Sequence, residues 1–116
     1  MKNRNFGERL GFALAGIRIV ASREKSFRAQ LGLGAGAIAA LAALRPGSLW
    51  CAVVLLAVGL VLALEMANAA LEYLIDHLHP QLAEEVGHSK DAAAGAVLLG
   101  SVAAAGVGAM MLLSLL

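Results

Sequence analysis

Four polar side chains recur near the end of the most apolar part of the chain, at a spacing that places them on one face of a helix. They are Glu65, Asn68, Glu72 and Asp76. These positions fall at about 0°, 300°, 340° and 20° around a helix, in a stripe about 80° wide and about 16 Å long. The other side of this helix is expected to carry Met66, Ala70, Tyr73 and Leu74.

Three carboxylates in one stripe repel one another, so this face needs a cationic partner: a divalent ion, Lys or Arg, or protons. Glu65 directly follows the uncharged run 46–64 and is expected below a membrane surface, with Glu72 and Asp76 closer to water. Acidic groups beside hydrocarbon are costly and usually functional. Mg²⁺ is a suitable partner because one or two carboxylates plus phosphates often hold it. The alternative interpretation is a solvated helix face, which suits Asp76 best.

Three further charged residues lie at the starts of apolar runs. Lys90 and Asp91 precede the run 92–116, and Glu24 precedes the run 29–44. Lys90 suits either a phosphate contact or an anchor at a membrane interface. Glu24 either joins the carboxylate stripe or is an ordinary surface charge. The chain has no phosphate-binding loop of the Walker type, and His77, His79 and His88 do not have the spacing of a zinc site.

The elements that must position these residues are predicted to be membrane helices. The chain is 60% hydrophobic and 15% charged, with a mean hydropathy of +0.81, far from the composition of a soluble domain. A spanning helix needs about 20 mainly apolar residues. We therefore expect an all-α integral membrane domain over residues 1–116. Its spans are predicted at about 27–45, 48–76 and 90–116, the second with a cytoplasmic extension, and a cytoplasmic loop is predicted at 77–89. Ser48 is expected to cap the second span after the turn at Arg45-Pro46-Gly47.

Residues 5–23 are too charged to span a membrane. Phe6, Leu10, Leu14 and Ile17 recur there at helical spacing, which favours an amphipathic helix lying on the membrane surface. The alternative is a soluble helix packed on a partner. The longest uncharged stretch of this segment, 10–17, is too short for the apolar part of a cleavable signal peptide.

Charge predicts the orientation. Seven basic residues precede the first span, namely Lys2, Arg4, Arg9, Arg18, Arg23, Lys25 and Arg28. The positive-inside rule then places the N-terminus and the 77–89 loop in the cytoplasm, and the C-terminus outside. The net charge of +1 does not indicate a nucleic-acid partner. The single Cys51 is expected to be plain apolar core.

Three motifs together resemble the prokaryotic diacylglycerol kinase family, which includes undecaprenol kinases. Residues 65–76 match the family pattern E-x-x-N-[ST]-A-[IL]-E-x-x-x-D, with Ala69 in place of the usual Ser or Thr. Residues 90–97 match K-D-x-[AG]-[SA]-[AG]-A-V, and Gly16 to Arg28 matches G-[IL]-x … E-x-x-[FM]-R. The resemblance covers nearly all of the chain. His79-Pro80 and the Ala-Ala-Gly run after Asp91 are closer to the undecaprenol branch.

The resemblance implies a homotrimer of three-span subunits in the bacterial inner membrane, with active sites at subunit interfaces. It implies phosphoryl transfer from ATP, with Mg²⁺, to a membrane lipid alcohol, either diacylglycerol or undecaprenol. Carried over by position, Glu65 is the general base and Glu24 and Glu72 are the metal ligands. Asn68, Asp76, Lys90 and Asp91 are then the ATP and site contacts.

Two other functions fit the residues without the resemblance. One is a small cation- or proton-coupled transporter with Glu65 as the carrier, and the other is a non-enzymatic packing subunit. The third apolar run has no acidic residue, which disfavours a path through the membrane. The sequence leaves open which lipid alcohol is the substrate.

Overall fold

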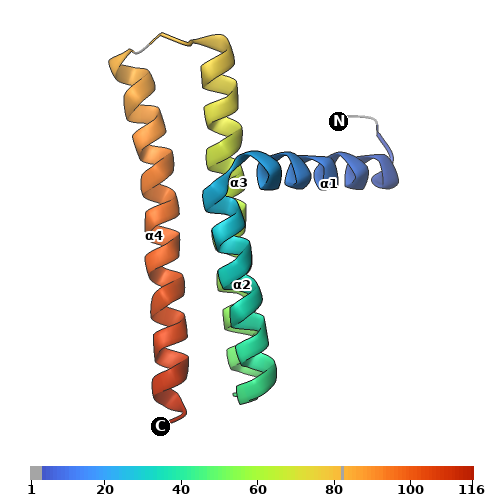
Figure 1. Cartoon of the computed structure of the whole chain (residues 1–116), viewed down its shortest axis with the longest axis vertical. Coiled ribbons are helices and arrows are strands. Elements are labelled where there is room, and N and C mark those ends of the chain that lie inside the picture. The colour runs from blue at the N-terminus through green and yellow to red at the C-terminus, as the bar shows by residue number, and fades with distance from the viewer. Residues whose placement is uncertain (1–3, 82) are drawn as a thin grey trace.

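The structure, a computed structural model, describes residues 4–81 and 83–116 and contains four α-helices over them (Figure 1). They are α1 (Phe6–Arg23), α2 (Lys25–Leu44), α3 (Ser48–Leu78) and α4 (Glu84–Ser114). By length and composition α2, α3 and α4 can each cross a membrane. This confirms the predicted all-α fold with three candidate spans. Lys2 of the basic segment and one position of the predicted loop lie outside the described residues.

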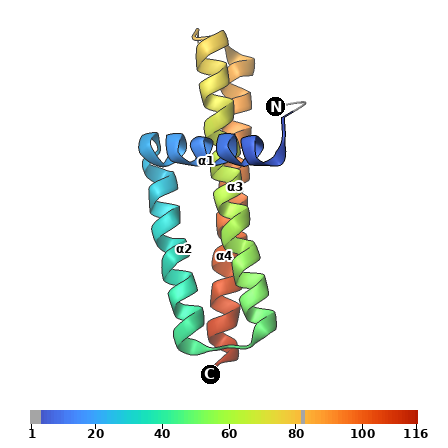
Figure 2. The same cartoon turned by 90° about the vertical axis from the view of Figure 1, so that its right-hand side faces the viewer.

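The three long helices run side by side, and α1 runs crosswise to them, projecting outward from the start of α2 (Figure 1). Helix α3 is the central element and packs against both α2 and α4. Figure 2 shows α1 crossing α3 part of the way along its length, so that α3 and α4 continue beyond α1. The α3–α4 connection lies at that projecting end, and the α2–α3 turn and the C-terminus lie at the other (Figure 1).

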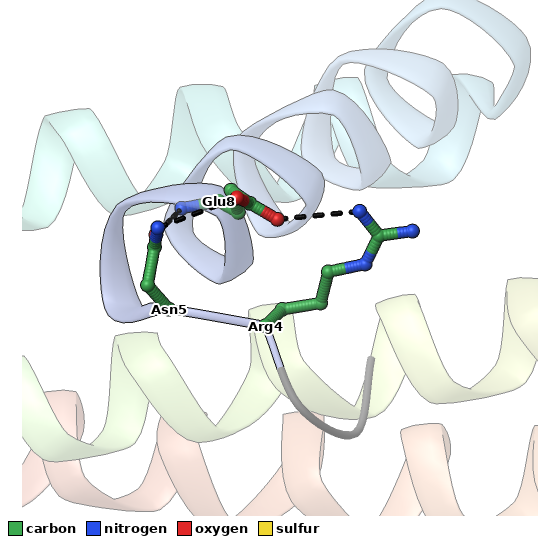
Figure 3. A network of polar contacts seen from close by, with 3 residues as sticks. All are labelled: Arg4, Asn5 and Glu8. Carbon is green, nitrogen blue, oxygen red and sulfur yellow. Dashed lines mark hydrogen bonds and ion pairs between the residues drawn. The ribbon is translucent and has the colours of Figure 1, made fainter.

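Local side-chain bonds fix the start of α1 (Figure 3). Asn5 is the N-cap, and its side-chain oxygen accepts a hydrogen bond from the backbone N–H of Glu8 at 2.8 Å. The Glu8 carboxylate accepts from the Asn5 amide at 3.3 Å and from the Arg4 guanidinium at 3.2 Å. Such a cap satisfies a backbone donor that no helical partner reaches.

A single residue, Glu24, separates α1 from α2, and we call this junction the corner. Glu24 is extended, with φ −106° and ψ 111°. Arg28 reaches back from α2 and donates to the backbone carbonyls of Ala21 at 2.8 Å and Ser22 at 3.2 Å. These carbonyls lie in the last turn of α1, where acceptors lack helical partners and a cation is favoured. Arg28 therefore holds α1 and α2 at a fixed angle.

The turn between α2 and α3 uses two residues with positive φ, Arg45 at 50° and Gly47 at 108°. The predicted cap at Ser48 is wrong, because Gly47 is the N-cap and Ser48 is already the first helical residue. The physical reason is the left-handed backbone at Gly47, which favours glycine. With glycine in the capping position, α3 begins without a side-chain cap.

The loop predicted at 77–89 is much shorter in the structure. Helix α3 continues to Leu78, just before the His79-Pro80 step, and α4 begins at Glu84 rather than near residue 90. Proline disfavours helix at the residue before it, which explains the end of α3. Glu84 and Glu85 lie in the first turn of α4, where acidic side chains are favourable. The polar residues at the start of α4 are therefore helical, although their composition predicts a loop.

Two sets of buried apolar residues hold the helices together. The corner cluster consists of Val20, Phe27 and Ala69, with Ala21, Leu62, Met66 and Tyr73 packed against it. The turn cluster consists of Leu41, Val54 and Met111, with Ala37, Trp50, Cys51, Val58 and Val107 around it. The first joins α1, α2 and α3, and the second joins α2, α3 and α4. Cys51 is a free, partly buried thiol within the second.

Candidate active site

Glu65 is a buried carboxylate on α3, at the level where the corner packs. Glu65 is only 5% exposed, and it is the one charged residue that is buried among the described residues. The Ser26 hydroxyl, in the first turn of α2, donates to Glu65 Oε2 at 3.0 Å. A buried carboxylate needs hydrogen-bond partners. Ser26 therefore fixes the orientation of Glu65 and uses only one of its two oxygens.

The carboxylate of Glu24 points from the corner onto α3. The Tyr73 hydroxyl donates to Glu24 Oε2 at 2.8 Å. The Arg23 guanidinium carbon lies 5.3 Å from the centroid of the same tyrosine ring, within the range of a cation–π interaction. The predicted site residue Glu24 is thus brought beside the stretch of α3 that carries Glu72.

Asn68 and Glu72 are linked one helical turn apart on α3. Asn68 Nδ2 donates to Glu72 Oε1 at 3.3 Å. The Asn68 Oδ1 atom is buried and has no hydrogen-bond partner among the described residues. Buried polar atoms are normally satisfied, so this oxygen is free to accept a bond from, or coordinate, another group.

Asp76 and Lys90 join α3 to α4 beyond the corner. Lys90 Nζ donates to Asp76 Oδ1 in an ion pair of 2.5 Å. Asp76 is exposed and Lys90 is partly buried. Asp91 is exposed and lies about 100° around α4 from Lys90. The structure therefore brings Asp76 and Lys90 together and leaves Asp91 apart from them.

One prediction about α3 is corrected. Tyr73 and Met66 were expected on the face opposite the carboxylates, but both pack against the corner cluster. They lie about 80° and 100° from Glu65 around the helix, which makes them flanking residues. Sequence reasoning missed Ser26 and Tyr73 as partners of the carboxylates. The sequence did hold a clue to Ser26: its hydroxyl comes only two residues after the predicted site residue Glu24.

The oxygens of this region suit a hard divalent cation. The Glu24 carboxylate bonds to Tyr73, and Glu72 precedes Tyr73 on α3. Asn68 Oδ1 is an amide oxygen without a partner among the described residues. Among the residues that the structure describes, no three His, Cys, Asp or Glu side chains converge on one point. Mg²⁺ usually takes only one or two carboxylates and completes its shell with phosphate and water oxygens. The residues present therefore fit Mg²⁺ bound together with a nucleotide.

An apolar cavity of about 330 Å³ lies between the three long helices, on the side of Glu65 toward the α2–α3 turn. Val61, one turn before Glu65, lines this cavity. Gln30 and Ser101 also line it, and Gln30 Nε2 donates to Ser101 Oγ at 3.4 Å. The remaining lining residues are Leu33, Gly34, Ala37, Val54, Ala57, Val58, Ala104, Ala105, Val107 and Gly108. Its wall is suited to a hydrocarbon chain.

These features define a class of protein. It is all-helical, α2, α3 and α4 are able to cross a membrane, and hydrogen-bonded carboxylates lie where α1 and α2 meet the central helix α3. The family model for prokaryotic diacylglycerol kinase matches residues 11–112. The chain therefore belongs to the prokaryotic diacylglycerol kinase family, as the three motifs predicted.

A curated relative supports the same assignment. The chain is 37% identical over 103 residues to a diacylglycerol kinase from Synechocystis sp.. The match covers 88% of this chain and 59% of that relative, so the chain spans well under two thirds of the relative's length.

Proposed function

We propose that this protein is a membrane lipid kinase that transfers the γ-phosphoryl group of ATP to the hydroxyl of a lipid alcohol. The observation that carries this proposal is the buried Glu65 carboxylate. Ser26 donates to its Oε2 at 3.0 Å, and its Oε1 accepts no hydrogen bond from the described residues. It lies between an apolar cavity on one side and polar, partly exposed side chains on the other. The cavity would then hold the lipid tail, Glu65 would meet the lipid hydroxyl, and the polar side chains would meet the nucleotide.

Glu65 is the proposed general base. Its second carboxylate oxygen accepts the proton of the lipid hydroxyl. At the same time the oxygen of that hydroxyl attacks the terminal phosphorus of ATP, and ADP leaves. Ser26 keeps the carboxylate in one orientation, which general-base catalysis requires because the acceptor atom must be within hydrogen-bond reach. Phosphoryl transfer depends on positioning and charge neutralisation more than on covalent chemistry.

Glu24 and Glu72 are the proposed Mg²⁺ ligands. When bound, Mg²⁺ neutralises phosphate charge and orients the phosphate chain. The proposed nucleotide contacts are Asn68, through its unpartnered Oδ1, and the Asp76–Lys90 pair. Asp91 was assigned to the same group from the family motif, and its exposed position suits a contact from outside this bundle.

The acceptor proposed is diacylglycerol, giving phosphatidic acid, or undecaprenol, giving undecaprenyl phosphate. Both present one hydroxyl on a long apolar body. The apolar cavity next to Glu65 accepts the first part of such a chain, and the hydroxyl then lies at the carboxylate. The Synechocystis relative is a diacylglycerol kinase, which favours diacylglycerol, whereas His79-Pro80 resembles the undecaprenol branch.

The test is phosphate transfer by the purified full chain in lipid–detergent micelles with Mg²⁺ and γ-labelled ATP. Diacylglycerol and undecaprenol are supplied separately, and an alkane-chain ester without a hydroxyl serves as the control. We expect label in the lipid phase only when an alcohol is present. ATP hydrolysis without labelled lipid, or no nucleotide consumption with either alcohol, contradicts the proposal.

We also propose a homotrimer in the bacterial inner membrane, with the N-terminus and the α3–α4 connection in the cytoplasm and the C-terminus outside. One observation supports an assembly: Asp91 is exposed and lies about 100° around α4 from Lys90, so a neighbouring chain can reach it. Mixing inactive Glu24→Gln and Glu65→Gln chains should restore part of the activity when sites form between subunits. No rescue, in oligomers shown to be mixed, argues for a site within one chain.

A further inference from the structure

We propose that Tyr73 is a positioning residue for Glu24: its hydroxyl holds the corner carboxylate in the orientation that binds Mg²⁺. This inference rests on the proposed kinase function. It assigns a task to a side chain outside the three motif patterns, since position 73 is variable in the pattern that residues 65–76 match. The argument comes from how Glu24 is held, and from what remains free on it.

The backbone alone does not direct the Glu24 side chain. Glu24 is both the C-cap of α1 and the N-cap of α2, yet its carboxylate makes no capping bond to the α2 backbone. It turns instead to Tyr73, on a different helix 49 positions away. The bond uses Oε2 at 2.8 Å, and Oε1 accepts no hydrogen bond from the described residues. One oxygen is therefore fixed and the other is available.

The tyrosine ring is itself held on two sides. It packs against the corner cluster, and the Arg23 guanidinium lies over it at 5.3 Å. Arg28 fixes the backbone on either side of Glu24 through its bonds to the end of α1. The donor and the acceptor of the Tyr73–Glu24 bond are thus both set before any ion binds. Such preorganisation lowers the cost of ordering a ligand when the ion arrives.

Metal-binding carboxylates are commonly held by a second hydrogen-bonding group, and losing that group weakens metal binding by roughly 10- to 100-fold. Tyr73 has the geometry of such a group. The competing explanation is structural: the bond merely fastens the corner to α3. In the first explanation the hydroxyl contributes to Mg²⁺ binding, and in the second it contributes to stability. Removing only the hydroxyl separates them, because the ring makes the apolar contacts.

The test is Tyr73→Phe in the full chain, which removes the hydroxyl and keeps the ring. Mg²⁺ is titrated calorimetrically in the presence of a non-hydrolysable ATP analogue, and the Mg²⁺ dependence of phosphate transfer is measured alongside. We expect about tenfold weaker Mg²⁺ binding, a kcat at saturating Mg²⁺ within about twofold of the parent, and an unchanged melting temperature.

Ser22→Ala is the matched control. It also removes one side-chain hydroxyl at the corner, but that hydroxyl donates only to the Ile19 carbonyl, at 2.8 Å. Mg²⁺ binding should equal that of the parent chain. Arg23→Gln, which leaves the bond and removes the cation over the ring, should weaken Mg²⁺ binding by less than Tyr73→Phe does.

The outcomes separate this inference from the kinase proposal. Unchanged Mg²⁺ binding in Tyr73→Phe, with transfer to lipid intact, overturns the role of Tyr73 and leaves the kinase standing. A lowered melting temperature with unchanged Mg²⁺ binding assigns the bond a structural role. A parent chain that binds no Mg²⁺ with the nucleotide and labels no lipid overturns both.

Discussion

The corner cluster and the turn cluster do the same packing task with different surroundings. Each joins three helices through three buried apolar residues. Around the corner cluster, hydroxyls from Ser26 and Tyr73 bind carboxylates on other helices. Around the turn cluster, the Ser114 hydroxyl donates within its own helix, to the Met111 carbonyl. Between the two clusters, the neutral side chains of Gln30 and Ser101 also bond across helices, at 3.4 Å. The corner differs because its interhelical bonds hold carboxylates, and acidic groups at membrane depth are costly and usually functional.

The sharpest way to test this contrast is Glu65→Gln, which keeps the shape of the side chain and removes the proposed base. We expect kcat to fall by roughly 10²–10⁴-fold, the usual loss with a general base. The apparent affinity for ATP should change little, because Glu65 is proposed to contact the lipid hydroxyl and not the nucleotide. Steady-state kinetics on assembled protein measure both values.

Met111→Leu, a change of similar volume in the turn cluster, is the control and should retain normal kcat. Near-normal turnover in Glu65→Gln contradicts the assignment of the base. The carboxylate stripe then requires another explanation.

A second comparison truncates one buried side chain in each cluster. Phe27→Ala and Met111→Ala should each lower the free energy of unfolding by on the order of 2–5 kcal/mol, because each leaves a void. Only Phe27→Ala should also lower kcat, by about tenfold or more. Phe27 follows Ser26 and supports the corner that carries Glu24, and small displacements of positioning groups are costly in rate.

Thermal unfolding and kinetics well below the melting temperature separate these two effects. Equal loss of kcat in both variants would show that the turn cluster also positions the site. The functional distinction between the clusters would then be wrong.

Ser26→Ala tests the tether of Glu65 at smaller scale. We expect kcat to fall about fivefold to tenfold, because one hydrogen bond to a buried carboxylate is lost, worth about 1–1.5 kcal/mol. Ser26→Thr, which keeps a hydroxyl, should restore most of the rate. The Ser114→Ala variant removes the hydroxyl near the turn cluster and should leave kcat unchanged. If Ser26→Ala behaves like Ser114→Ala, Ser26 does not orient the base.

The last effects concern stability rather than turnover, and they are expected at two glycines that allow close helix packing. A Cβ at Gly34 would lie 2.8 Å from Val58 Cγ1, and one at Gly100 would lie 2.5 Å from Leu64 Cδ1. The stiff branched Val58 cannot move easily, whereas the end of Leu64 can. Gly34→Ala should therefore destabilise by about 1–2 kcal/mol and Gly100→Ala by less. Gly32→Ala, which meets nothing within 4 Å, is the control. A larger loss in Gly100→Ala than in Gly34→Ala would contradict this ranking.

The sequence predicted the elements well because hydropathy and the 3.6-residue period are local properties. The three candidate spans and the separate helix before them all follow from neighbouring residues. The bonds from Ser26 to Glu65 and from Tyr73 to Glu24 join positions 39 and 49 apart, and they depend on how the corner folds against α3. No local pattern encodes that contact.

The wrong details have local causes. The loop predicted at 77–89 was too long because the polar first turns of α4 have loop-like composition. The cap was assigned to Ser48 by residue type, whereas the backbone angle of Gly47 decided it. Tyr73 was placed on the wrong face because a flanking position about 80° from Glu65 was treated as opposite.

The corner would also set the depth of the proposed active site within the bilayer. Helix α2 has 20 residues, which is about 30 Å of helix and equals the usual thickness of the hydrocarbon layer. In the proposed placement α1 lies on one lipid surface, and the α2–α3 turn reaches the other. The depth of Glu24 and Glu65 is then measured from the lipid surface rather than from the centre of the protein. A thicker or thinner bilayer must tilt α2 or displace α1, and either change acts directly on the corner. In this placement, the acyl-chain length of the surrounding lipids would change turnover independently of which lipid alcohol is the substrate.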